Sequence, residues 1–226
     1  MEQAVLFLSK NENVAVVCGR LREQYPERSI YNMLCDIEWD TPVGEAKACG
    51  GIAMMRVAAF ERVNGFRADL IAGEEPELSV RLRALGWHIW RLAEEMALHD
   101  AAMTRFTQWW RRSMRSGCAF AEGAALHGRS PARHWVQESR SAWLWSAGIP
   151  LASLIAALLA GPWTFSILLV YPAQIVRLAM QGRCTPVKNW KRACFLVLGK
   201  FPEALGQIQY WRNRFASKTN TLIEYK

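Results

Sequence analysis

Apolar residues recur with different spacings along the first half of the chain, and these spacings predict alternating helices and strands. The continuous apolar run over residues 14–18 is typical of a buried strand, and residues 2–9 and 29–39 are predicted to be helical. Residues 87–92 alternate as a short strand, and residues 96–100 end another. The pattern therefore predicts an α/β layer in this half of the chain.

Longer apolar segments in the second half predict a pair of membrane helices. Residues 143–160 contain no charged side chain and approach the ~20 residues that a spanning helix needs. Residues 163–176 form a second segment that extends to residue 180, and a Gly-Pro dipeptide between the two segments signals a tight turn. The alternative is a buried hairpin in a soluble protein, because a proline interrupts each segment.

Charge is divided unevenly and orients this predicted hairpin. The net charge is +8, yet residues 1–99 hold 11 Lys and Arg against 15 Asp and Glu, so the basic excess belongs to the second half. Basic residues on both flanks predict that both termini are cytoplasmic and that the hairpin lies in the cytoplasmic (inner) membrane. Membrane lipids are thus expected partners, and nucleic acid is not, since the basic and aromatic residues run directly into a membrane segment.

A basic amphipathic tail is predicted over residues 181–226, lying on the inner leaflet. Its apolar patch consists of Phe195, Leu196, Leu198 and Phe201. The last five residues carry no sorting or lipidation signal. Six cysteines occur without zinc-finger spacing, so free, reduced thiols are expected.

Three carboxylates gather at the predicted start of a helix in the first half. The stretch reads Gly73-Glu74-Glu75-Pro76-Glu77-Leu78 and continues into Arg81-Leu82-Arg83. Pro76 fits the first helical position, where its missing N–H costs nothing. Leu78, Leu82 and Leu85 then repeat at helical spacing along one face that is predicted to be buried.

The positions of these acids predict different roles for them. Glu75 lies at the helix mouth, where the partial positive charge of the helix end favours an ionised carboxylate, the state that a general base needs. Glu77 and Arg81 are four residues apart and are predicted to form a surface ion pair. The alternative is that all three acids only cap the helix.

The order of motifs around this stretch resembles that of family 2 glycosyltransferases. A Gly50-Gly51 pair precedes a predicted strand, an arginine, a helix and a Gly-Phe dipeptide, and the acidic pair and Arg-Leu-Arg follow. Downstream, the sequence Gln108-Trp109-Trp110-Arg111 resembles the Q-x-x-R-W signature of the polysaccharide-making branch, with arginine in the last place. The resemblance spans roughly residues 14–117 and implies part of a GT-A-like (Rossmann-like) layer.

The resemblance implies inverting transfer from a nucleotide-sugar donor to a lipid-linked or glycan acceptor. Glu75 would accept the proton of the acceptor hydroxyl, and Glu74 and Arg81 would position it. Gly50 and Gly51 are expected to contact substrate.

Two functions are open for the segment that contains the downstream signature. In one, Gln108 and Arg111 hold sugar or diphosphate, with Trp109 and Trp110 beside them. In the other, this aromatic and basic surface lies at the membrane interface. Both can hold on opposite faces of one helix.

A divalent metal, Mg²⁺ or Mn²⁺, is implied by the resemblance, with its main ligands outside this chain. His99 is predicted at a strand terminus near the acidic pair, where it would contact the metal, and a hydrogen-bonded pair with Asp100 is the alternative. The acids at positions 36, 38 and 40 are expected to be exposed helix residues, because a metal–diphosphate site needs its acids on a tight loop.

In the resemblance, the first helix and strand follow the D-x-D loop, so the nucleotide-binding half that precedes them is expected to be missing from this sequence. The chain alone is then expected to be inactive, with a separate chain as one source of that half. Four segments are predicted: the acceptor-side half of a glycosyltransferase domain (1–125), a basic interfacial linker (126–141), the hairpin (142–180) and the tail. A non-catalytic, membrane-anchored scaffold of a polysaccharide machine is the alternative function.

Overall fold

The computed structural model describes residues 2–70 and 72–216, and these fall into two compact units that divide between Phe106 and Thr107. The acceptor-side half that the sequence predicts, residues 1–125, extends into the second unit. It does so because one long helix begins at Phe106 and continues to His127.

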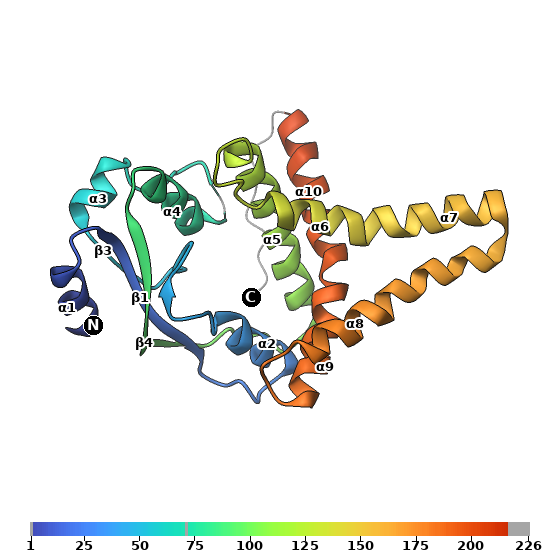
Figure 1. Cartoon of the computed structure of the whole chain (residues 1–226), viewed down its shortest axis with the longest axis horizontal. Helices are drawn as coiled ribbons and strands as arrows, with labels where there is room; N and C mark the ends of the chain where they lie inside the picture. Colours follow the sequence, from blue (N-terminus) through green and yellow to red (C-terminus); the bar gives the residue numbers. More distant parts are fainter. Residues whose placement is uncertain (1, 71, 217–226) are drawn as a thin grey trace. The chain divides into compact units, whose positions relative to one another are not determined.

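The first unit is a mixed α/β layer, as predicted (Figure 1). Its elements are α1 (Glu2–Lys10), β1 (Val14–Glu23), α2 (Ile30–Trp39), β2 (Gly44–Glu45), β3 (Met54–Met55), α3 (Val57–Arg62), α4 (Glu74–Ala84) and β4 (His88–His99).

The sheet has the order β2-β4-β1-β3, with β1 and β4 parallel and each edge strand antiparallel to its neighbour. The prediction of two separate strands between residues 87 and 100 was wrong, because β4 is one strand that pairs with β1 from His88 to His99, with register shifts along the ladder. The register shifts around Arg20 coincide with the break in apolar alternation from which two strands were predicted.

Helices cover both faces of this sheet (Figure 1). On one face, Ala4 and Leu8 of α1 pack against Val14 and Val17 of β1. On the other face, α3 and α4 form the larger core with the sheet. This core consists of Ala15, Val16, Ala59, Val63, Leu78, Leu82 and Ile89. The two layers explain why residues 14–18 are apolar without alternation.

A buried polar network connects α2 to the ends of both long strands. Ser29 caps α2 by accepting the Asn32 N–H at 3.0 Å. The buried Glu23 carboxylate accepts the Asn32 side-chain N–H at 2.8 Å and the Ala101 N–H at 2.9 Å, while Asn32 Oδ1 accepts from the Met103 N–H at 3.1 Å. These bonds satisfy buried polar groups and fix the chain where it leaves β4.

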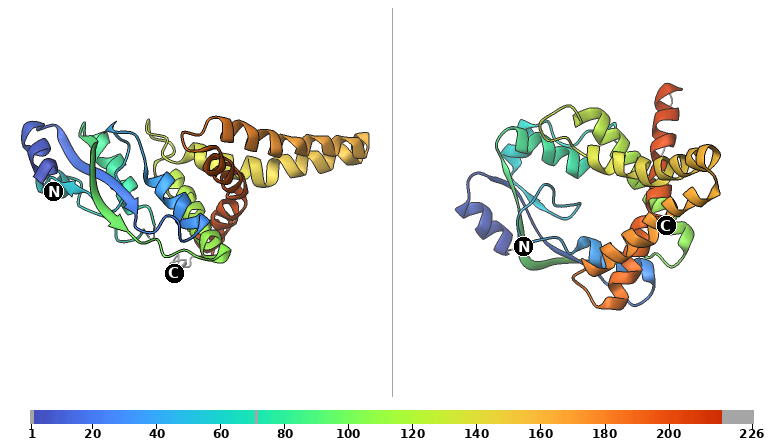
Figure 2. Two further views of the ribbon diagram at one scale, coloured as in Figure 1. Left: turned by 90° about the horizontal axis from the view of Figure 1, so that it is seen from below. Right: turned by 45° about the vertical axis from the view of Figure 1, so that its right-hand side comes forward.

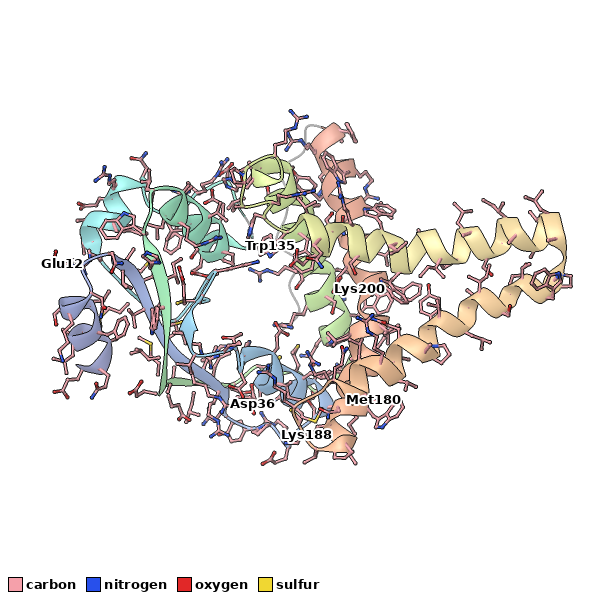
Figure 3. The ribbon with its side chains drawn as sticks, viewed as in Figure 1. Glu12, Asp36, Trp135, Met180, Lys188 and Lys200 are labelled. Atoms are coloured by element: carbon pink, nitrogen blue, oxygen red, sulfur yellow. The ribbon has the colours of Figure 1, made fainter. Side chains whose placement is uncertain are left out.

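Asp36 and Asp40, near the end of α2, are ion-paired, and Asp36 is not exposed as expected. Asp36, labelled in Figure 3, is half-buried, accepts the Glu23 backbone N–H at 3.1 Å and lies 4.0 Å from Arg20. Asp40 is exposed and lies 3.4 Å from Arg20 and 3.6 Å from Arg91. The ion pairs arise because the arginines come from strands that the pattern of α2 alone does not reveal.

The second unit is helical. Its elements are α5 (Phe106–His127), α6 (Val136–Trp143), the π-helix η1 (Leu144–Gly148), α7 (Ile149–Ala160), the 3₁₀-helix η2 (Pro162–Leu169), α8 (Val170–Met180), α9 (Pro186–Leu198) and α10 (Lys200–Phe215).

Two glycines allow α5 and α10 to approach backbone to backbone. A Cβ at Gly117 of α5 would lie 1.9 Å from the Glu203 carbonyl oxygen, and a Cβ at Gly206 of α10 would lie 1.9 Å from the Met114 carbonyl oxygen. The Cys118 thiol donates to the Gly206 carbonyl oxygen at 3.0 Å. Only residues without a side chain fit both positions at this crossing.

A helical hairpin lies at the predicted position (Figure 2), and its two arms pack together near the turn, where α7 contacts η2, and diverge away from it in Figure 1. The helical stretches Val136–Ala160 and Pro162–Met180 are each long and apolar enough to cross a membrane, and little of either is buried inside the protein. The turn falls at Gly161, whose φ of 99° suits glycine. Side chains project outward along both arms (Figure 3).

The predicted tail forms two helices, and its apolar patch is divided between different contacts. Phe195 packs edge-on against Trp109 with ring centroids 4.8 Å apart, and Phe201 stacks on Tyr171 at 6.3 Å. Leu196 and Leu198 stay exposed. The two phenylalanines of the predicted apolar patch thus pack against helices from elsewhere in the unit, and only the two leucines are exposed. Residues 217–226, including the predicted end of the tail, lie outside the described residues.

Candidate active site

The acidic stretch begins α4, as predicted, with a small shift in register. Gly73 is the N-cap with φ 84°, and Glu74 is the first helical residue. Pro76 therefore occupies the third helical position and not the first. Its missing N–H still costs nothing at the third position, because the first intrahelical bond runs from the Glu77 N–H to the Gly73 carbonyl. Leu85 caps the helix and is 52% exposed, so its predicted place on the buried face was wrong.

The Glu75 carboxylate is buried at the start of α4 and accepts three hydrogen bonds. Oε1 accepts the Cys49 backbone N–H at 3.0 Å and the Ser79 hydroxyl at 2.7 Å, and Oε2 accepts the Gly50 backbone N–H at 2.8 Å. The side chain is only 6% exposed. These bonds hold the carboxylate in one orientation and connect the loop between β2 and β3 to the helix.

That loop leaves open space beside the acid. Gly50 has φ +91°, a conformation that favours glycine, and a Cβ at either Gly50 or Gly51 would meet no atom within 4 Å. Both glycines are exposed. The structure thus brings together Glu75 and Gly50, two of the predicted site residues, with Gly51 next to them on an open surface.

Glu77 and Arg81 do form an ion pair, but it is not on the surface. Their closest oxygen and nitrogen lie 2.7 Å apart, the Glu77 side chain is 2% exposed and that of Arg81 is 22% exposed. Arg81 also donates to the carbonyl oxygens of Val63 and Gly65, in the turn that follows α3. The pair is buried because that turn covers the helix face, which the spacing within α4 does not reveal.

These contacts give Arg81 a structural role in the Val63–Gly65 turn. Its guanidinium donates to Glu77, Val63 and Gly65, and the carboxylate of Glu75 is bound by other donors. Glu74, the other predicted positioning residue, is half-buried in the first turn of the helix.

Two free cysteines lie beside Glu75. Cys18 of β1 is buried, and Cys49 of the loop is half-buried with its thiol directed to the Trp90 carbonyl oxygen at 3.7 Å. The neighbouring Cys49 thiol lowers the pKa of Cys18, whereas burial and the negative charge of Glu75 oppose this lowering and the positive charge of Arg91 adds to it. The Cys18 side chain, together with burial, raises the pKa of Cys49.

His99 ends β4, as predicted, and is exposed with its ring 5.4 Å from that of Trp39. Asp100 instead lies 3.4 Å from Arg28 and accepts the Ala102 N–H at 2.7 Å. In residues 2–70 and 72–216, no three His, Cys, Asp or Glu side chains are grouped as metal ligands. The residues that the structure describes therefore do not provide a ligand set that fits a divalent metal.

The downstream signature lies in the second unit, near the start of α5. Trp109 is buried against Phe195, so it packs in the helical core, whereas Trp110 and Gln108 are half-buried and Arg111 is exposed. The two functions that the sequence leaves open for this segment both remain predictions.

Ser79 and Cys18 are absent from the sequence-based set of site residues. Ser79 lies four positions after Glu75, a spacing that places both on one helix face and could have indicated the contact. For Cys18 and Cys49 no comparable signal exists, because 31 positions separate them and only the fold makes them neighbours.

Comparison with protein families finds a match, to a glycosyltransferase-type domain, in the first unit. Residues 33–105, about a third of the chain, match a family described as the N-terminal domain of galactosyltransferase, a GT-A-type glycosyltransferase domain. The matched segment contains every predicted site residue from Gly50 to His99. No curated protein matches the chain.

The match supports the general class, a transferase of sugars, which requires a nucleotide-sugar donor and an acceptor. It is not specific to family 2 or to the membrane polysaccharide type, so those finer assignments stay predictions.

Proposed function

We propose that this protein transfers a sugar, with inversion, from a nucleotide-sugar to a lipid-linked or polysaccharide acceptor at the cytoplasmic face of a membrane. One observation carries the proposal: within the matched segment, the Glu75 carboxylate is fixed by three hydrogen bonds beside the open loop at Gly50 and Gly51. A general base needs this combination of a fixed carboxylate and room for the group that it deprotonates.

The hydrogen bonds to Glu75 leave it able to act as a base. Among the described contacts, Oε2 accepts one hydrogen bond, from the Gly50 N–H, and a carboxylate oxygen can accept two. The acceptor hydroxyl would donate to Oε2 and pass its proton there while its oxygen bonds to the anomeric carbon. The bond from that carbon to the diphosphate breaks, and the nucleoside diphosphate leaves with the bonding electrons.

The membrane aspect of the proposal is supported by the hairpin. Its two arms are apolar, expose most of their side chains and carry basic residues on both flanks. A catalytic unit on the same chain as a membrane hairpin suits an acceptor that is itself held in the membrane.

A second candidate function is a membrane-anchored scaffold without catalysis. The three donors on Glu75 favour this second function, because three such hydrogen bonds also suit a purely structural carboxylate that connects the loop to the helix. A transfer assay separates the two functions.

The transfer assay uses membranes of the cells that naturally make the protein. We expect label from one donor in a panel of radiolabelled nucleotide-sugars to enter the lipid or polysaccharide fraction, and to be lost on deletion of the gene. Restoring the gene should restore incorporation. If incorporation from every donor in the panel is the same with and without the gene, the chain is not a glycosyltransferase and the scaffold function is favoured.

The topology of the hairpin is tested by cysteine labelling. Leu159 is 83% exposed near the turn, so a Leu159→Cys variant should react with a membrane-impermeant maleimide on intact cells. Native Cys184 and Cys194 are exposed and should react only after permeabilisation, while buried Cys118 is the unreactive control. Labelling of Cys184 or Cys194 on intact cells would contradict cytoplasmic termini.

A further inference from the structure

We propose that one face of α10 binds the headgroup region of an anionic lipid bilayer, in the leaflet through which the hairpin enters. This apolar face consists of Leu205, Ile208, Trp211 and Phe215, which are between 37% and 83% exposed. Their spacings of three and four residues place them along one side of the helix. The proposal rests on the membrane part of the proposed function and does not depend on sugar transfer.

The opposite side of α10 is held inside the second unit. Gln207 and Tyr210 are almost fully buried. At Gly206 the helix lies so close to α5 that a Cβ would be 1.9 Å from the Met114 carbonyl oxygen. These contacts fix the rotation of α10 about its axis, so the apolar face is directed outward by the fold.

Contacts with both arms of the hairpin fix the level at which α10 lies. Phe201 stacks on Tyr171 of α8 with ring centroids 6.3 Å apart, and the Ser139 hydroxyl of α6 donates to Gln207 Oε1 at 2.6 Å. The helix runs across the base of the hairpin in Figures 1 and 2. Ser139 lies 22 residues before Gly161 at the turn. That length is about 33 Å of helix, close to the ~30 Å thickness of the hydrocarbon core, so α10 lies where the hairpin leaves that core.

The apolar face of α10 is also on the side that meets the hairpin. Ile208 and Phe215 follow Phe201 by 7 and 14 residues, close to two and four helical turns. Their side chains therefore project from the side of α10 on which Phe201 stacks against α8. A helix that lies across the base of a membrane hairpin, with an exposed apolar face on that side, has the geometry of an interfacial helix.

The charges at the end of α10 identify the kind of lipid. Arg212 and Arg214 are both exposed, and the Arg214 guanidinium lies 5.9 Å from the centre of the Trp211 ring. The one acid of this helix, Glu203, pairs with Lys200 at 2.7 Å near the other end. Tryptophan is enriched at headgroup depth, and arginine attracts anionic headgroups. An anionic lipid surface therefore matches both the apolar and the basic residues of this face.

The first test places a fluorophore on the apolar face of the full chain, reconstituted into vesicles of phosphatidylcholine and phosphatidylglycerol. Nitrobenzoxadiazole is attached to Ile208→Cys, in a background in which the accessible cysteines Cys49, Cys184 and Cys194 are replaced by serine. Nitroxide lipids should quench this label, and aqueous iodide should not. The matched control is Asn213→Cys on the opposite side of α10, where iodide should quench the label and nitroxide lipids should not.

Two results at Ile208 would overturn the proposal. Quenching by iodide would place the apolar face in water, and protection from both quenchers would mean that a protein surface, such as a second copy of this chain, covers it. Leu154→Cys, in the middle of α7 and 49% exposed, reports on the hairpin in the same vesicles. Lipid quenching at Leu154 without lipid quenching at Ile208 would overturn this proposal alone. A Leu154 label that iodide reaches would overturn the membrane part of the proposed function and this proposal with it.

The second test measures the contribution of charge. Arg212→Gln should lower the ratio of lipid-inserted to free Ile208 label by ~5-fold, the factor that one arginine near an anionic surface gives. The effect should disappear in vesicles of phosphatidylcholine alone. Arg62→Gln is the matched control, because it removes the same charge from an exposed position of α3 and should leave the ratio unchanged. Equal insertion with and without phosphatidylglycerol would overturn the anionic lipid as the partner of this face.

Discussion

Replacement of Glu75 by glutamine is expected to lower sugar transfer by about 10²–10⁴-fold, the usual contribution of a general base. Glutamine keeps the size of glutamate but cannot accept the proton of the acceptor hydroxyl. Transfer is measured in native membranes with the substitution made at the chromosomal locus, and the amount of protein is measured in the same samples.

Two controls separate loss of the base from loss of its surroundings. Glu74→Gln removes the same charge from the same helix turn, and Ser79→Ala removes the 2.7 Å hydrogen bond to Oε1 while leaving the carboxylate. Each should lower transfer by less than ~10-fold, since neither removes the proton acceptor. Equal losses in Glu75→Gln and Ser79→Ala would mean that the carboxylate only holds the loop. Glu77 is unsuitable as a control, because its buried pair with Arg81 makes Glu77→Gln a stability variant.

Replacement of Gly206 by alanine is expected to destabilise the second unit by about 3 kcal/mol or more, at the upper end for overpacking. The new Cβ would lie 1.9 Å from the Met114 carbonyl oxygen and 2.9 Å from the Cys118 backbone nitrogen. These are backbone atoms of α5, which cannot rotate aside as a flexible side chain would, so the two helices must separate.

The buried thiol of Cys118 reports this separation directly. Burial raises the pKa of Cys118 to about 11, so its thiolate is scarce at neutral pH, and its thiol bonds the Gly206 carbonyl. In detergent solution, Gly206→Ala should speed alkylation of Cys118 by ~100-fold, the factor that about 3 kcal/mol gives. Gly148→Ala is the matched control, since its Cβ would meet the Leu144 side chain at 3.4 Å and the Trp143 carbonyl oxygen at 3.7 Å, both without a clash. Equal alkylation rates in the two variants would contradict the close helix crossing.

Local signals in the sequence determined the helices, the long buried strand and the acidic start of α4. Ser29 before an apolar periodic run predicts the start of α2, because a serine hydroxyl caps the free N–H groups there. The charge-free segments and the intervening Gly-Pro predict the hairpin in the same way. Each of these signals acts over a few neighbouring residues, so it can be read without knowing the fold.

Tertiary structure alone decided what surrounds each side chain. Leu85 continues the apolar spacing of α4 yet is exposed, and Glu77 was predicted at the surface yet is buried. The reason is that periodicity indicates which face of a helix is apolar, but not how far the neighbouring layer covers that face. The donors to Glu75 come from residues 25 and 26 positions earlier in the chain. Such contacts depend on strand order and loop path, which no local pattern specifies.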